Sequence, residues 1–212
     1  MSESTIAEQT VAAFLEVLGS DSPTPGGGAV GAVAAATGAS LVGMVSRLTV
    51  GKQGYEGVDE RMRALAVQAD AARVEFLDLA DRDAHAFDGV MTAFRMPKET
   101  DEQKSARSVA IQKGYREAAQ VPLECLRKAV EAMPMAIEAT ATGNVQAVSD
   151  GLSAAASIYC GVLCAAANVH INAAALKDEG ERAPMLDEIA TLRSRAEQSL
   201  MEAQTAFQLR MS

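Results

Sequence analysis

The chain has 212 residues, of which 49% are hydrophobic and only 4% aromatic, and its formal net charge is −9. That length and hydrophobic content suit one folded domain with a sizeable core and argue against intrinsic disorder. The negative charge argues against a broad nucleic-acid-binding surface and against binding to an anionic membrane. We therefore expect a single domain over residues 1–212 and no nucleic-acid partner.

The first predicted helix begins at a capping box of Thr5 and Glu8 and ends at Gly19. After a Pro-rich loop, residues 26–46 form an uncharged stretch rich in Ala, Gly and Ser. Small residues recur there every four positions, which favours a core helix that other helices approach closely.

Two long amphipathic segments follow. The first is predicted to span Val58 to Arg95, and the second to run from a cap at Thr100 to about Gln120. Pro122 fits the first turn of a further helix, which Pro134 should kink or break.

Residues 151–176 form a second uncharged stretch, and Pro184 is expected to open the last amphipathic helix. Both uncharged stretches are long enough to span a membrane. They lack aromatic belts, and the second contains Asn168, His170 and Asn172, so we expect core helices and no membrane partner. No segment alternates like a strand. The predicted fold is all-α, a helical bundle with two buried Ala/Gly/Ser-rich central helices surrounded by amphipathic helices.

Gly26, Gly28 and Gly31 match the spacing G-x-G-x-x-G. A dinucleotide-binding fingerprint needs a preceding strand and a later acidic residue, and this chain has neither. Glycines that open a helix still expose backbone N–H groups at its positive end, where a carboxylate or phosphate can bind. Glycine can equally serve close packing, and the two interpretations are compatible.

Gly51 and Gly54 are expected to end the first core helix and bend the chain, which places Lys52 and Tyr55 beside a buried element. Without other context, Lys52 is more often a solvated loop residue than a functional one.

Asp81, His85 and Asp88 share one face of a predicted helix, but the chain has only two histidines and no second cluster, so we expect no metal site. Asp83 lies on another face beside apolar residues. It is either a half-buried functional carboxylate or a residue that flanks the core.

Ser149 and Asp150 precede the second core helix, where both residue types are favoured as N-caps. Asn168 and Asn172 are four residues apart on one face of that helix. Because buried amides need partners, they bind either neighbouring core groups or a ligand.

The order of these segments resembles the formimidoyltetrahydrofolate cyclodeaminase family, which includes free-standing methenyltetrahydrofolate cyclohydrolases. The motifs that carry the resemblance are SPTPGGG (22–28), LTVGK (48–52) with Tyr55, DAHAFD (83–88), VPL (121–123), Gly143-Asn144, Ser149-Asp150 and NVHIN (168–172). It covers roughly residues 5 to 205. Arg47 departs from the pattern, because a smaller or neutral residue is expected there.

The resemblance implies a homodimer with a folate site in a groove near the subunit interface, and no metal or cofactor. The odd number of cysteines (Cys125, Cys160 and Cys164), without a CxxC pair, favours a reducing, cytoplasmic location. The catalytic residues expected from it are Lys52, Asp83 and Asp150. The expected substrate-binding residues are Pro25, Gly26, Gly27, Gly28, Tyr55, Phe87, Asn144, Ser149, Asn168 and Asn172.

Three functions are open at this point. The first is hydrolysis of 5,10-methenyltetrahydrofolate to 10-formyltetrahydrofolate, in which Asp83 or Asp150 orients water and Lys52 moves a proton. The second is a cyclodeaminase that closes 5-formiminotetrahydrofolate to the methenyl form and releases ammonia. The third is a non-catalytic folate-binding dimer. No formimino-transferring domain accompanies the matched segment here, which favours the cyclohydrolase.

Overall fold

The computed structural model describes residues 5–212, and every regular element in that range is helical. The all-α prediction is confirmed. The α-helices are α1 (Val11–Leu18), α2 (Gly27–Thr49), α3 (Asp59–Phe94), α4 (Asp101–Thr142), α5 (Val148–Ala174) and α6 (Glu179–Met211). Three short 3₁₀ helices, η1 (Ile6–Glu8), η2 (Glu56–Val58) and η3 (Val145–Ala147), lie between or before them.

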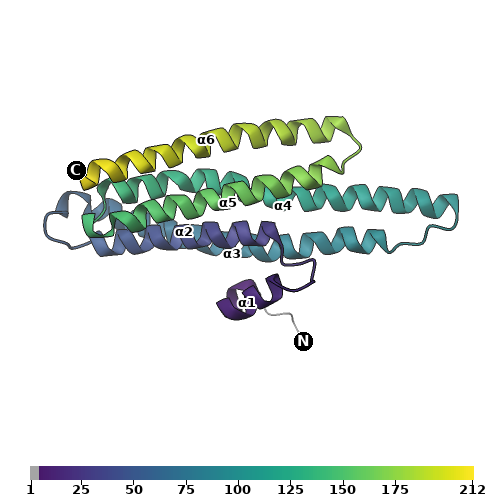
Figure 1. Cartoon of the computed structure of the whole chain (residues 1–212), viewed down its shortest axis with the longest axis horizontal. Helices are drawn as coiled ribbons and strands as arrows, with labels where there is room; N and C mark the ends of the chain where they lie inside the picture. Colours follow the sequence, from purple (N-terminus) through teal and green to yellow (C-terminus); the bar gives the residue numbers. More distant parts are fainter. Residues whose placement is uncertain (1–4) are drawn as a thin grey trace.

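Helices α2, α3, α4 and α5 form a bundle, and α6 packs along α4 and α5. In Figure 1, α2 and α5 lie side by side on the near face, with α3 and α4 behind them. Helix α1 lies outside the bundle near the start of α2, and Phe14 is its single buried residue.

Glycines allow α2 and α5 to approach closely. A Cβ atom added at Gly38 would lie 2.6 Å from Ile158 Cγ1 and 2.7 Å from the Ala154 carbonyl oxygen. On the other helix, a Cβ at Gly161 would lie 2.7 Å from the Gly31 carbonyl oxygen. The interpretation of these stretches as closely packed core helices is therefore confirmed.

Both helices are long and apolar enough to cross a membrane, but 61% of the most apolar α2 segment and 44% of the corresponding α5 segment are buried within the bundle. We had expected both helices to be covered on all sides. The structure instead leaves one side of each exposed, because α6 covers α5 only from the side of α4.

Several predicted helix boundaries were wrong. Helix α4 continues through Pro122 and Pro134 without a break, and residues next to both prolines, such as Leu123 and Met133, are buried in the core of the bundle. Helix α6 begins at Glu179 instead of Pro184, since the Asp178 side chain caps it by accepting from the Gly180 N–H.

The capping box of Thr5 and Glu8 is present, but it holds only η1. Gln9 and Thr10 then adopt extended conformations, which interrupts the helix predicted to run on to Gly19. Helix α1 starts afresh at Val11, where the Thr10 hydroxyl accepts from the Ala13 N–H at 3.1 Å.

The unequal lengths of the bundle helices create a hollow. Helix α2 begins only at Gly27, whereas α3, α4 and α5 continue beyond that level (Figure 1). Side chains of these three helices therefore face a space that α2 would fill if it were longer, and the first turn of α2 closes one end of that space.

Candidate functional site

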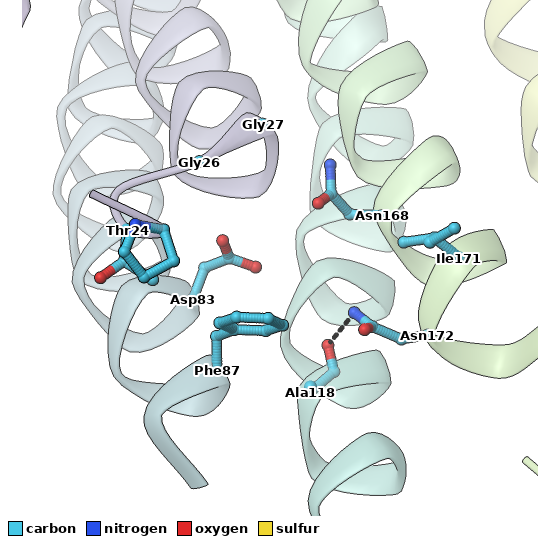
Figure 2. A pocket seen from close by; sticks show the side chains of 10 residues that line it. Thr24, Gly26, Gly27, Asp83, Phe87, Ala118, Asn168, Ile171 and Asn172 are labelled. Atoms are coloured by element: carbon cyan, nitrogen blue, oxygen red, sulfur yellow. Dashed lines mark hydrogen bonds between the residues drawn. The ribbon is translucent and has the colours of Figure 1, made fainter. Parts of the chain in front are cut away.

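A cavity of about 190 Å³ occupies the hollow at the start of α2 (Figure 2). Helices α3, α4 and α5 and the loop before α2 all contribute to it. Its lining residues are Pro23, Thr24, Gly26, Gly27, Asp83, Phe87, Ala118, Asn168, Ile171 and Asn172. The structure thus brings together six of the predicted site residues: Gly26, Gly27, Asp83, Phe87, Asn168 and Asn172.

Asp83 is the single titratable side chain among these lining residues. Its carboxylate accepts a backbone N–H bond from Ala29 in the first turn of α2. Burial raises the pKa of the Asp83 carboxyl to about 6, and the Ala29 N–H opposes that shift only in part. A carboxyl group with such a pKa can both take up and release a proton near neutral pH.

Gly28 makes this position possible. A Cβ atom at Gly28 would overlap both carboxylate oxygens of Asp83. The protein's own carboxylate therefore occupies the positive end of α2, where the sequence had suggested that a substrate anion binds.

The two amides approach the cavity from α5. Asn168 donates its Nδ2 hydrogen to the Cys164 carbonyl at 2.8 Å, and a Cβ at Gly27 would lie 3.0 Å from the same Nδ2 atom. In residues 5–212 neither Asn168 nor Asn172 has a hydrogen bond to its amide oxygen, so both oxygens are free to accept from a ligand.

Asn172 is fixed by a bond to α4. Its Nδ2 atom donates to the Ala118 carbonyl at 3.0 Å, as the dashed line in Figure 2 shows. In a regular helix that carbonyl would accept from residue 122, but Pro122 has no N–H. Pro122 therefore leaves the Ala118 carbonyl without a helical donor, and the Asn172 side chain donates to it instead.

Pro25 lines a second, adjacent cavity of about 560 Å³ between the N-terminal segment and α3. Asp81 and His85 also line that cavity, but both already have hydrogen-bond partners within the chain. The Asp81 carboxylate accepts from the Ile6 N–H at 2.7 Å, and His85 Nδ1 lies 2.7 Å from the backbone carbonyl oxygen of Asp81. Within residues 5–212, no three His, Cys, Asp or Glu side chains are grouped so as to hold a metal ion.

Lys52 lies at the opposite end of α2. Gly51 and Gly54 have φ values of 71° and 88°, which bend the chain as predicted. The Lys52 Nζ atom donates to Asn144 Oδ1 at 2.8 Å and to Gln146 Oε1 at 3.2 Å. Asn144 is buried and also donates to the Leu48 carbonyl, so it ties the end of α2 to the start of α5.

Tyr55 belongs to the same end of the bundle. Its hydroxyl oxygen accepts from the Val145 N–H at 2.8 Å and from Arg210 at 3.3 Å. The Val145 bond is the main reason that the pKa of Tyr55 lies below its usual value. Sequence reasoning missed Arg210, because it is 155 residues away and no local pattern marks it.

Ser149 and Asp150 also lie at this end, in the first turn of α5, where Ser149 is exposed and Asp150 is half-buried. Neither is the N-cap, because η3 continues directly into α5 and Ala147 takes that position.

The three predicted catalytic residues are thus not gathered within one chain. Asp83 lies at the start of α2, whereas Lys52 and Asp150 lie beyond its other end. A helix of that length extends about 33 Å at the normal rise per residue. Among the described residues 5–212, the length of α2 therefore separates Lys52 from the cavity that Asp83 lines.

Comparisons with known proteins agree with one another. The family model described as formiminotransferase-cyclodeaminase matches residues 10–191. A methenyltetrahydrofolate cyclohydrolase of Methylorubrum extorquens is 38% identical over 188 residues, which cover 89% of this chain and 90% of that protein. The formimidoyltransferase-cyclodeaminase of Rattus norvegicus is 35% identical over 84% of this chain but only 33% of its own length.

One solved structure is similar over almost the whole molecule. The formiminotetrahydrofolate cyclodeaminase of Thermotoga maritima matches with a TM-score of 0.86 at 28% sequence identity. The match covers 98% of this chain and 100% of that one.

Proposed function

The chain belongs to the formiminotransferase-cyclodeaminase family, and we propose that it is a methenyltetrahydrofolate cyclohydrolase. The observation that carries the proposal is Asp83, a half-buried carboxyl group with a pKa of about 6 in an amide-lined cavity at a helix start. Similarity to the M. extorquens cyclohydrolase along most of both chains favours this activity.

The reaction needs a group that handles protons beside a cation. In 5,10-methenyltetrahydrofolate the reacting carbon lies between N5 and N10 in a positively charged amidinium. The Asp83 carboxylate stabilises that charge and accepts a proton from the water that adds to the carbon. The protonated Asp83 then donates to N5 as the bond from N5 to the carbon breaks, and the hydroxyl proton of the intermediate is released to solvent as the formyl C=O forms. The product is 10-formyltetrahydrofolate, and Asp83 returns to its starting state.

The rest of the cavity orients the pterin. The free amide oxygens of Asn168 and Asn172 accept hydrogen bonds from pterin N–H groups, and Phe87 supplies an apolar wall. The proposed chemistry uses water and proton transfer alone, so we propose that it requires neither a metal nor an organic cofactor.

A second candidate is the cyclodeaminase activity, because the T. maritima protein with the same fold has that name. There N10 attacks the formimino carbon, and the proton released from N10 is delivered to the amino group that leaves as ammonia. The same Asp83 carboxyl serves this transfer.

An assay of the purified protein with 5,10-methenyltetrahydrofolate and with 5-formiminotetrahydrofolate distinguishes the cyclohydrolase from the cyclodeaminase activity. We expect rapid loss of the methenyl absorbance and no ammonia from 5-formiminotetrahydrofolate. Ammonia release without accelerated methenyl hydrolysis would replace the first activity with the second. Binding of folate without either reaction would favour the non-catalytic alternative.

We further propose that the protein is a cytoplasmic homodimer. Its three cysteines, Cys125, Cys160 and Cys164, are all free, as in a reducing compartment. An uncharged, exposed helical face supports the dimer, and native mass spectrometry would test it.

A further inference from the structure

Arg210 bonds the last turn of α6 to two loops that lie far from it in the sequence. Its Nη2 atom donates to the Gly143 carbonyl at 2.7 Å and to the Tyr55 hydroxyl oxygen at 3.3 Å. We name residues 50–58, between α2 and α3, the Lys52 loop, and residues 143–147, between α4 and α5, the Gly143 loop. The C-terminus and the Lys52 loop lie at the same end of the bundle (Figure 1).

The last turn of α6 contributes little else to the bundle. Among residues 208–212, Arg210 is the single residue that is not exposed, and the neighbouring Leu209 is 73% exposed. Within residues 5–212 the Arg210 Nε atom is buried without a hydrogen bond, which costs about 1–3 kcal/mol. The guanidinium group is thus held against both loops in spite of that cost. Such departures from the most stable arrangement are expected at functional sites.

The Lys52 loop is fixed from outside by two of its side chains. The backbone N–H groups of Gly51 and Gly54 bond to carboxylates no more than eight residues away, so these bonds are local. Both glycines have a positive φ, in a region where glycine moves freely. Hydrogen bonds to distant parts of the chain come from the side chains of Lys52 and Tyr55. The position of Tyr55 therefore helps to determine where the backbone of Lys52 lies.

The Lys52 amine is bound to the Gly143 loop. Its Nζ atom donates to Asn144 Oδ1 at 2.8 Å and to Gln146 Oε1 at 3.2 Å. The next bond between the two loops is made by the Val145 N–H, which donates to the Tyr55 hydroxyl oxygen at 2.8 Å. A shift of either loop would therefore move the amine, and Arg210 bonds one residue in each.

The contact between Arg210 and Tyr55 also changes the phenol. The pKa of Tyr55 lies below its usual value, chiefly because the Val145 N–H donates to the hydroxyl oxygen. Arg210 lowers this pKa further, both as a second hydrogen-bond donor and as a nearby positive charge. The contact can therefore be followed in solution through the ionisation of Tyr55.

We propose that Arg210 is a positioning residue for Lys52, because it holds together the two loops that fix the Lys52 amine. The last turn of α6 then belongs to the functional site, although Arg210 itself touches no reacting atom. The inference rests on the proposed function and on the prediction that Lys52 moves a proton in that reaction.

The variant Arg210→Gln tests the effect on the reaction. Glutamine is polar but has neither the charge nor the forked donors of arginine. We expect kcat for methenyl hydrolysis to fall about 10- to 100-fold, as small displacements of a reacting group cause. KM should change little, because the lost interaction acts on the transition state. The matched control is Arg195→Gln, an exposed arginine of the same helix, which should keep both constants. Wild-type constants in Arg210→Gln would overturn the proposal.

A double-mutant cycle shows whether Arg210 acts through Lys52. In a Lys52→Ala background, Arg210→Gln should lower kcat no further, because the amine that it positions is already absent. An equal fall in kcat with and without the Lys52 amine would overturn the proposal. So would a lower Tm with an unchanged kcat of the folded protein, since that result would confine Arg210 to stability.

The ionisation of Tyr55 tests the contact without any substrate. The chain has three tyrosines, so ultraviolet titration in a Tyr115→Phe, Tyr159→Phe background follows Tyr55 alone. We expect the pKa of Tyr55 to rise in Arg210→Gln and to stay unchanged in Arg195→Gln. An unchanged pKa in Arg210→Gln would reject the arrangement. A protein that shows the expected rise but turns over neither folate would instead reject the proposed function.

Discussion

The carboxylate of Asp83 lies in the space that a side chain on Gly28 would need. The first turn of α2 and the middle of α3 approach so closely that the Ala29 N–H bonds the carboxylate directly. A glycine at this position of α2 therefore determines where the proposed proton-transfer group points.

Substitution of this glycine tests that relationship. We expect Gly28→Ala to push the Asp83 side chain away and to lower kcat by about a hundredfold, since small displacements of a catalytic group have effects of that order. Gly89→Ala is the matched control, because a Cβ at Gly89 in α3 meets nothing within 4 Å. That control should keep its activity and gain about 0.5–1 kcal/mol of stability, as Ala does over Gly in a helix. Equal activity of both variants would contradict the assigned role of Gly28.

The rate should depend on pH through Asp83. The carboxyl must be ionised to accept a proton from water, so kcat/KM should fall about tenfold per pH unit below the pKa of about 6. Above that pH the profile should level off. Because the bound amidinium cation favours the ionised carboxylate, the corresponding limb of kcat should lie at lower pH. A profile of kcat/KM that is flat between pH 5 and pH 7 would exclude Asp83 as the base.

Stability should also depend on this group. The pKa of Asp83 is raised from 3.8 to about 6 in the folded protein, so between these values the folded state binds more protons than the unfolded state. The free energy of unfolding therefore decreases as pH rises through this window, by up to about 3 kcal/mol from this residue. Comparing urea unfolding of the wild type and Asp83→Asn at pH 4 and pH 7 isolates the effect. We expect the free energy of unfolding of Asp83→Asn to lack this decrease between pH 4 and pH 7. An equal pH dependence in the two proteins would show that folding does not raise the pKa of the Asp83 carboxyl.

Asn172 and Pro122 should be energetically coupled through the Ala118 carbonyl. Asn172→Ala leaves this carbonyl without a donor and should cost about 1–3 kcal/mol of stability. Pro122→Ala restores a backbone N–H at position 122, so the double variant should recover part of that loss. Equilibrium unfolding of all four proteins in the cycle measures the coupling. Strictly additive effects would mean that the two residues do not share the carbonyl.

Much of the fold was predictable because hydrophobic periodicity is local. The uncharged stretches at 26–46 and 151–176 predicted α2 and α5, and the segment from Val58 to Arg95 predicted α3 to within one residue at each end. The prolines of α4 were misleading, because packing by neighbouring helices overrode a local preference. Pro122 did carry usable information. A proline leaves the carbonyl four residues earlier without a helical donor, which predicts that the Ala118 carbonyl bonds to another group.

The candidate site was predictable only in part, for a geometric reason. Motif order placed Gly26, Gly27, Asp83, Phe87 and the amides of α5 in the candidate set, and these residues do meet at one cavity. The sequence also placed Lys52 after the end of the first core helix, and within one chain the structure puts it at the opposite end of α2 from Gly27. The roles of Lys52 and Asp150 in the reaction stay predictions. The contacts of Arg210 and the exposed side of α5 arise from tertiary packing, which no single segment encodes.

The central claim is that Asp83 moves the protons of methenyltetrahydrofolate hydrolysis. The most direct measurement is the loss of methenyl absorbance at pH 7 for the wild type, Asp83→Asn and the control Asp88→Asn, which alters an exposed carboxylate of the same helix. We expect Asp83→Asn to fold normally and to lose about 10²- to 10⁴-fold in kcat, the usual contribution of a general acid–base group, while Asp88→Asn keeps its rate. A correctly folded Asp83→Asn protein with wild-type turnover would contradict the account.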